Sequence, residues 1–280
     1  MSHARIHAAS LGQSTRQILA DGFYQTAAGH TVDLAPLLAQ ARAGVRSYPP
    51  EDSLPNAAVG MHATRITVTN ESTLAAARRL AQDGGRVVAL NFASARHPGG
   101  GWLSGAHAQE ESLVRASGLV ACIADDPMYA RHARSHDTLY TSSAIYTPDV
   151  PVFRDDAGCL LDTPYLAAFI TAPAVNAGVV LGRDPSRRNA VTGAMRERIA
   201  RVLAIAALHG YTALVLGAWG CGVFQNDPAE IAGLFAAALH GPFRGAFGDV
   251  IFAVLDPSAE RRFIRPFERA FGGVGGDNGY

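Results

Sequence analysis

The chain has 280 residues, with 24 basic and 24 acidic side chains and therefore a formal net charge of zero. This balance argues against a general binder of nucleic acid or of membrane surfaces, because such proteins carry an excess of basic residues. Charged residues make up 17% of the chain and apolar residues 48%. This composition predicts a folded globular protein with a sizeable core.

The basic residues are all arginines, and the sequence contains no lysine. A P-loop needs a lysine on its phosphates, and Schiff-base and pyridoxal enzymes need a lysine amine, so these classes are excluded. The cysteines Cys122, Cys159 and Cys221 form no CxxC pair, which argues against a disulfide scaffold or structural zinc and favours the cytoplasm. We find no signal-peptide core and no apolar run near the ~18 residues of a membrane span.

The predicted elements change in character near residue 60. Before it, residues 14–21 and 34–42 have helical spacing, residues 31–33 form a short extended segment, and the prolines of residues 48–55 indicate a linker. After it, strands and helices alternate, which predicts a largely parallel or mixed sheet with helices on both faces. The predicted strands are residues 64–69, 86–93, 143–146, 151–154, 167–171, 212–216 and 250–255. The predicted helices are residues 71–82, 109–124, 127–133, 186–209, 228–239 and 258–271.

We expect this α/β chain to form one folded unit with an extension. Residues 1–55 form an N-terminal helical extension packed on the core, residues 56–272 form the catalytic domain, and the glycine-rich residues 273–280 form a flexible tail.

The first informative loop follows the predicted strand at residues 86–93. His97-Pro98 leads into three glycines, residues 99–101, and Gln109-Glu110-Glu111 then begins a helix. Three glycines let a ligand approach the backbone and leave amides to point at it, and loops at the carboxyl ends of strands are where α/β proteins bind ligands. The alternatives are a flexible surface turn and acids that only stabilise a helix N-terminus.

The second informative loop, residues 217–225, follows the predicted strand at residues 212–216. Asn226-Asp227-Pro228 then marks a helix start. Amides beside a helix N-terminus suit phosphate, and the glycine spacing does not fit the dinucleotide fingerprint. We expect a diphosphate cradle of backbone amides, with Phe224 packing against a sugar or, alternatively, in the core. Cys221 is expected to be inert, because no definite His partner is evident.

Together these motifs resemble the signature of the poly(ADP-ribose) glycohydrolases. The HPGGG and QEE segments are similar to the GGG…QEE signature of that family, and GAWGCGVF at residues 217–224 is similar to the diphosphate loop of its bacterial, macrodomain-only branch. Residues 15–24, 89–94 and 170–176 are also similar to that branch, so the resemblance covers nearly the whole chain. It implies a macrodomain-like mixed sheet flanked by helices, with an N-terminal helical extension. The implied reaction is hydrolysis of ribose–ribose O-glycosidic bonds, which releases ADP-ribose.

The resemblance also implies roles for individual residues. Glu111 would be the general acid/base, Glu110 would contact a ribose hydroxyl, and Gln109 would lie near the same ribose. The glycines of the first loop and residues 220–224 would hold the diphosphate and the distal ribose. The full set of expected substrate-binding residues is Asn91, Ser94, Gly99, Gly100, Gly101, Gln109, Gly220, Cys221, Gly222, Val223 and Phe224.

We expect neither a cofactor nor a metal, because no Asp or His cluster has ligand spacing, and His97 and His107 are expected to face solvent. The expected partners are poly(ADP-ribose) or ADP-ribosylated proteins, with ADP-ribose as product, and neither nucleic acid nor membrane. Two alternatives stay open, a non-catalytic ADP-ribose-binding macrodomain and a mono-ADP-ribosyl-protein hydrolase. The adjacent carboxylates favour an enzyme. A helix N-terminus lowers a carboxyl pKa, whereas burial and repulsion between the pair raise it.

Overall fold

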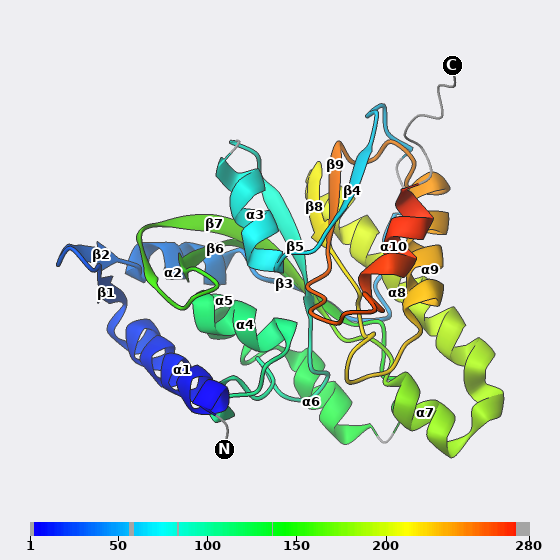
Figure 1. Ribbon diagram of the computed structural model, residues 1–280, viewed down its shortest axis with the longest axis horizontal. Helices are drawn as coiled ribbons and strands as arrows, with labels where there is room; N and C mark the ends of the chain where they lie inside the picture. Colours follow the sequence, from blue (N-terminus) through cyan, green and yellow to red (C-terminus); the bar gives the residue numbers. More distant parts are fainter. Residues whose placement is uncertain (1–2, 56–58, 83, 136, 273–280) are drawn as a thin grey trace.

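The computed structural model describes residues 3–272 except 56–58, 83 and 136, and the expected glycine-rich tail, residues 273–280, lies outside the described residues. The chain forms a seven-stranded mixed sheet between two layers of helices (Figure 1). No helix of the described part is long and apolar enough to cross a bilayer.

The sheet has the strand order β3-β6-β7-β5-β8-β9-β4. β4, β9, β8, β5 and β7 are parallel, whereas β6 is antiparallel to both of its neighbours. The largely parallel or mixed sheet expected from the sequence is therefore confirmed. The strands are β3 (Arg46–Tyr48), β4 (Arg65–Thr69), β5 (Val87–Phe92), β6 (Ala144–Arg154), β7 (Leu160–Ala172), β8 (Ala213–Leu216) and β9 (Asp249–Ala253).

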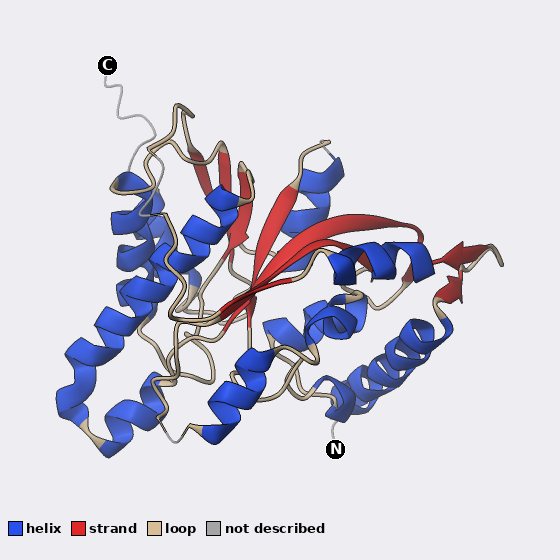
Figure 2. Cartoon of the chain, turned by 180° about the vertical axis from the view of Figure 1, so that it is seen from behind, coloured by secondary structure: helices blue, strands red, loops and turns tan. Residues whose placement is uncertain are grey.

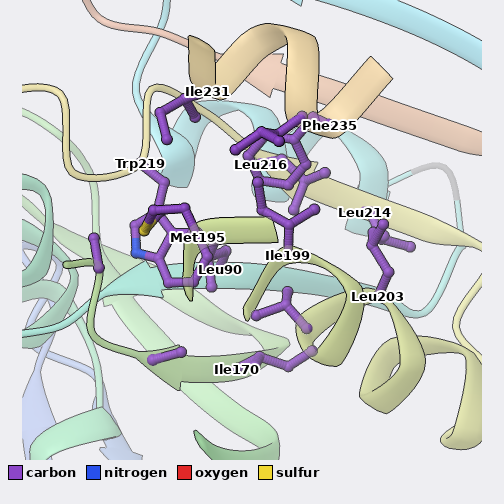
Figure 3. Close-up of a cluster of buried hydrophobic side chains, with 14 of the residues drawn as sticks. Leu90, Ile170, Met195, Ile199, Leu203, Leu214, Leu216, Trp219, Ile231 and Phe235 are labelled. Atoms are coloured by element: carbon purple, nitrogen blue, oxygen red, sulfur yellow. The ribbon is translucent and has the colours of Figure 1, made fainter. Parts of the chain in front are cut away.

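Alternation along the buried strands supplies a core on each face of the sheet. Leu90, Ile170 and Leu214 pack against Met195 and Phe235 of the helices on one face (Figure 3). That layer holds α8 (Arg188–Leu208), α9 (Pro228–His240) and α10 (Ile264–Phe271), with α7 (Ala177–Arg183) leading into α8. The other layer holds α3 (Thr73–Gln82), α4 (Gln109–Ala116), α5 (Leu119–Ile123) and α6 (Pro127–Arg134). Figure 2 shows the two layers from behind.

The first 55 residues cover the end of the sheet where β6 and β7 turn. They form α1 (His3–Asp21), a hairpin of β1 (Phe23–Gln25) and β2 (Thr31–Asp33), α2 (Ala35–Ala43) and β3. Ile18, Tyr24 and Leu38 form a small core with Phe153 of β6. Because β3 pairs with β6 in the main sheet, this segment is tied to the core, and the division of the chain at residue 55 stays a prediction.

Several element boundaries differ from those predicted. α1 begins at His3, well before residue 14, and packs against the short 3-10 helix η1 (Trp102–Ser104). The helix predicted at residues 109–124 is divided, because Ser117 is extended and bridges Val152 of β6. The two extended segments predicted at residues 143–154 are one strand with a register shift. α7 was not predicted, and α10 begins later than residue 258.

Candidate active site

The two glycine loops leave one edge of the sheet side by side. β5 and β8 are adjacent and parallel, with Val87 paired to Ala213, so both loops follow the carboxyl ends of neighbouring strands, as the sequence indicated. A cavity of about 630 Å³ lies there, a volume typical of small-molecule sites. The expected residues that line it are Ser94, Gln109, Glu110, Glu111, Gly220, Cys221, Gly222, Val223 and Phe224.

Three donors hold Glu110 at the wall of the cavity. Its Oε2 accepts a hydrogen bond from the Ser94 amide (2.6 Å), and its Oε1 accepts from the Gly99 amide (3.2 Å) and from Asn91 Nδ2 (3.5 Å). Only 3% of Glu110 is exposed. Burial raises the pKa of Glu110 to about 8, against these hydrogen bonds and with a further rise from the Glu111 charge. Glu110 is therefore largely protonated at neutral pH.

Glu111 is held by the two ends of the loop that precedes α4. Its Oε1 accepts from the Gly101 amide (2.9 Å) and its Oε2 accepts from the Ala108 amide (3.1 Å). The second bond caps α4, because the carboxylate reaches back to the amide that precedes its own helix. Each oxygen accepts one amide only, so a lone pair on each is available to a ligand.

The amides of the three glycines donate hydrogen bonds within the protein. The amides of Gly99 and Gly101 donate to Glu110 and Glu111, and the Gly100 amide donates to the His97 carbonyl (2.8 Å). At Gly100, φ is +60°, and a Cβ would lie 2.3 Å from Glu111 Oε1 and 3.2 Å from Glu110 Oε2. Glycine is required here because the backbone passes directly against the two carboxyls. The amides of these glycines thus serve to orient the acids, and the expected diphosphate contact stays a prediction.

Gln109 is also held by hydrogen bonds within the protein. Its Oε1 accepts from the Phe92 amide (2.9 Å), and its Nε2 donates to the Leu90 carbonyl (2.7 Å) and to Thr73 Oγ1 (3.1 Å). Both ends of the side-chain amide are used within the protein. Gln109 therefore fastens α4 to β5 while it lines the cavity, and the expected ribose contact stays a prediction.

The second loop presents the free amides that the first does not. Within the described part of the chain, the backbone N–H groups of Gly220, Gly222, Val223 and Phe224 donate no hydrogen bond. The loop is shaped by Asn226, whose amide and Nδ2 both donate to the Gly220 carbonyl. Consecutive free amides beside a cavity form an anion site.

Side chains of the second loop fall into two environments. Phe224 is half-buried, lines the cavity, contacts the ring of Tyr140 (6.4 Å between centroids) and also packs against the edge of the core. Cys221 is buried, and burial raises the pKa of its thiol far above the usual range. A thiol in that state is not a nucleophile, in agreement with the inert role expected from the sequence.

The charge of the cavity is acidic. Glu71 and Asp156 line it together with Glu110 and Glu111, and no arginine is among its described lining residues. Glu71 forms an ion pair with Arg79, and Asp156 accepts from Ser72 Oγ (2.7 Å). Nowhere in the described chain, the cavity included, do three His, Cys, Asp or Glu side chains come together at metal-binding distance.

Other lining residues were not predicted from the sequence. Ala253, Val254 and Leu255 lie at the end of β9, and Phe263 lies just before α10. β9 is the next parallel strand beside β8. The carboxyl end of the predicted strand at residues 250–255 could therefore have indicated these further lining residues of the cavity. Asp156 carried no such signal, because it lies in the turn between β6 and β7, on the opposite side of β5 in sheet order, and Thr73 begins the helix that follows β4 at the far edge of the sheet.

Comparison with known proteins places this geometry in a family. Residues 12–155 match the model of the microbial-type PARG catalytic domain, where PARG denotes poly(ADP-ribose) glycohydrolase. The PARG of Thermomonospora curvata is 48% identical, with a TM-score of 0.90 over 96% of this chain and 100% of that chain. This chain belongs to the microbial-type PARG family. A search of curated proteins found no match.

Solved structures of related PARGs include complexes. The Thermomonospora curvata enzyme bound to the inhibitor ADP-HPD is 49% identical, with a TM-score of 0.88 over 96% of this chain and 100% of that chain. The PARG of Deinococcus radiodurans in complex with ADP-ribose is 46% identical, with a TM-score of 0.80 over 85% of this chain and 98% of that chain. The resemblance to bacterial PARGs and the mixed α/β fold expected from it are confirmed.

Proposed function

We propose that this protein hydrolyses the ribose–ribose O-glycosidic bonds of poly(ADP-ribose) and releases ADP-ribose. The observation that carries the proposal is a cavity that combines two adjacent carboxyls with a row of free backbone amides. Amides of this kind suit a diphosphate, and carboxyls suit cleavage of a ribosyl bond. The Deinococcus radiodurans PARG complex with ADP-ribose supports the same ligand class.

Glu110 and Glu111 differ in protonation and in hydrogen bonding, and these differences assign them different roles. Glu110 is largely protonated below about pH 8 and is held by three donors, so it serves as an uncharged hydrogen-bond partner for a ribose hydroxyl. Glu111 keeps a lone pair on each oxygen and performs the proton transfers. A bound diphosphate brings negative charge beside both carboxyls, which favours retention of a proton by each of them.

The reaction then needs only groups that the cavity holds. With substrate bound, Glu111 carries a proton of its own beside the proton on Glu110, and it gives that proton to the leaving ribose oxygen as the bond to the anomeric carbon breaks. The sugar becomes oxocarbenium-like, and the substrate diphosphate stabilises its positive charge. A water then adds its hydroxyl to the anomeric carbon and returns a proton to Glu111.

The substrate contacts and the cellular location are part of the same proposal. Ser94 and residues 220–224 contact the ligand, with the free amides of Gly220, Gly222, Val223 and Phe224 on the diphosphate and the Phe224 ring on a ribose. Asn91, Gly99, Gly100 and Gly101 act through the carboxyls. The reaction takes place in the cytoplasm, which fits three free cysteines, Cys122, Cys159 and Cys221.

Incubation of the purified protein with radiolabelled poly(ADP-ribose), with and without EDTA, tests the proposal. We expect release of ADP-ribose that EDTA does not change. A protein that binds ADP-ribose but leaves the polymer intact would be a non-catalytic ADP-ribose-binding macrodomain. Cleavage of mono-ADP-ribosylated protein alone would indicate the other hydrolase class. Either result would overturn the proposed activity.

A further inference from the structure

The position of Glu111 depends on the shape of one short loop. Gly101 and Ala108, whose amides hold the two oxygens of Glu111, are the two ends of that loop. Inside it, the amides of Ser104 and Ala106 both donate to the Gly101 carbonyl, at 3.0 and 3.2 Å. Any change in the separation of the two ends would move one or both carboxylate oxygens.

A buried guanidinium fills the inside of this loop. Arg115 lies one helical turn after Glu111 on α4 and is 5% exposed. Its Nη1 donates to the Ala106 carbonyl at 2.8 Å and to the Trp102 carbonyl at 3.5 Å. The Arg115 side chain therefore links the Trp102 and Ala106 carbonyls, which belong to the loop whose two end amides bind Glu111.

The N-terminal helix α1 donates hydrogen bonds to the backbone of Arg115 and to the loop. Thr15 Oγ1 of α1 donates to the Arg115 carbonyl at 2.5 Å, and Arg5 Nε donates to the Ser104 carbonyl at 3.1 Å. Gly12 passes so close that a Cβ would lie 2.6 Å from the Trp102 carbonyl oxygen. The loop is thus held between α1 and α4, with Arg115 between its two halves.

Burial of the Arg115 guanidinium is energetically unfavourable if the side chain serves only to fill space in the core. Among the described residues it has no salt-bridge partner within 4.0 Å, and a cation out of water needs compensation. Burial lowers the pKa of Arg115, and the Glu111 charge raises it in return. Within the described part of the chain, the charged group that stabilises this cation is therefore Glu111, the carboxylate whose loop it holds.

We propose that Arg115 is a positioning residue for the proposed acid/base Glu111. It acts through the Trp102 and Ala106 carbonyls to set the separation of the Gly101 and Ala108 amides, and so fixes the carboxylate. It does not line the cavity and does not contact substrate. This inference rests on the proposed glycohydrolase function.

Two substitutions and a matched control test the inference. Arg115→Met removes the donors and the charge but keeps the stem, and we expect kcat to fall roughly 100-fold, the cost of a displacement near 1 Å at a reacting group. The Kd for ADP-ribose should change by less than about threefold, since binding groups are untouched. Arg115→Lys, which can still donate to the Ala106 carbonyl, should recover part of kcat.

The control is Arg154→Met on β6. Arg154 is also 5% exposed and also contacts α1, donating to Ser14 Oγ and Thr15 Oγ1, but its remaining bond goes to the Gly158 carbonyl. We expect Arg154→Met to lower Tm while kcat falls far less than in Arg115→Met, because Arg154 reaches Arg115 only through Thr15. Equal losses of kcat in the two methionine variants would reduce Arg115 to a general stabiliser and overturn the inference.

Other outcomes separate this inference from the proposed function. A folded Arg115→Met variant with full kcat, or one whose Kd rises as much as its kcat falls, overturns the positioning role. If Arg115→Met does not fold, Arg115→Lys decides, with reduced kcat at unchanged Kd supporting the role and full kcat overturning it. Failure of the unaltered protein to release ADP-ribose contradicts the proposed function instead.

Discussion

The buried carboxyl of Glu110 should make the stability of this protein fall as pH rises through neutrality. The group titrates near pH 8 in the folded chain and near 4.5 when unfolded, so the folded state binds the extra proton between those values. Stability contributed by a raised pKa is full below the unfolded value and is lost as pH rises to the folded value. Glu110→Gln removes the titration and should remove this dependence.

The magnitude follows from two buried groups with opposite signs. Glu110 lowers the unfolding free energy by about 1.4 kcal/mol per pH unit within its window. Burial lowers the pKa of His132 from 6.5 to about 4, so His132 contributes stability that is lost as pH falls through that range. The two slopes oppose one another below pH 6.5. Between pH 6.5 and 8 Glu110 dominates, and we expect a loss of about 2 kcal/mol.

Urea unfolding followed by tryptophan fluorescence measures this, because Trp219 is fully buried and Trp102 is nearly so. The Glu110→Gln variant should be less stable at pH 6.5 by about 1–3 kcal/mol, since its NH₂ group must face the amide of Ser94 or Gly99. Its unfolding free energy should then stay level up to pH 8. Glu111→Gln, which retains Glu110, should keep a falling slope that ends at a lower pH, because the Glu111 charge contributes to the raised pKa of Glu110. A level curve for the unaltered protein, or an equal slope in Glu110→Gln, would refute the reasoning.

Three further predictions concern the loops and the first helix. Glu111→Gln should lower turnover by roughly 10²–10⁴-fold while the Kd for ADP-ribose, measured by calorimetry, stays within a few-fold; full turnover would remove the catalytic assignment. Gly222→Val should fold, because a Cβ there meets nothing within 4 Å. It should weaken ADP-ribose binding at least about tenfold, because the valine methyls cover the free amides. Unchanged affinity would make this loop a plain turn. Gly12→Ala should lower Tm, because the added Cβ contacts the Trp102 carbonyl. The control Gly193→Ala lies on α8 with nothing within 4 Å of its Cβ, and its unfolding free energy should rise by up to about 1 kcal/mol from helix propensity. Equal shifts in Tm would contradict the close packing of α1.

The sequence was most informative where local chemistry and topology agree. Glycines after a strand, acids at the next helix start and an Asp227-Pro228 helix start after the second loop are local signals, and parallel neighbours β5 and β8 brought both loops to one edge. The strand and helix pairs at residues 64–82 and 250–271 were also recognisable from their apolar periodicity. These features depend on the residues themselves and on a short stretch of chain around them.

The sequence was least informative where distant contacts decide. The Gly99 and Gly101 amides bond to carboxyls because Glu110 and Glu111 lie directly beneath them, a placement that the spacing alone does not reveal. α1 extends to His3 because η1 packs along it, and α4 ends at Ser117 because that residue bridges β6. Each of these features depends on a contact with a residue outside its own element, so the local sequence pattern does not predict it.

The electrostatics of the cavity bear on how a ribosyl cation could be stabilised. The cavity has acidic lining residues and no arginine among those described, so a bound diphosphate would meet amides and not a neutralising cation. Its charge would then remain available to the oxocarbenium-like sugar. Protonation of Glu110 removes one repulsive charge, and the Arg115 guanidinium lies behind Glu111, outside the cavity lining. Because the Arg115 guanidinium lies outside the cavity lining, it holds the loop of Glu111 without neutralising the diphosphate. Val223→Arg, which places an arginine beside the free amides, should accordingly lower the Kd for ADP-ribose in calorimetry and lower kcat, and tighter binding at unchanged kcat would contradict this account.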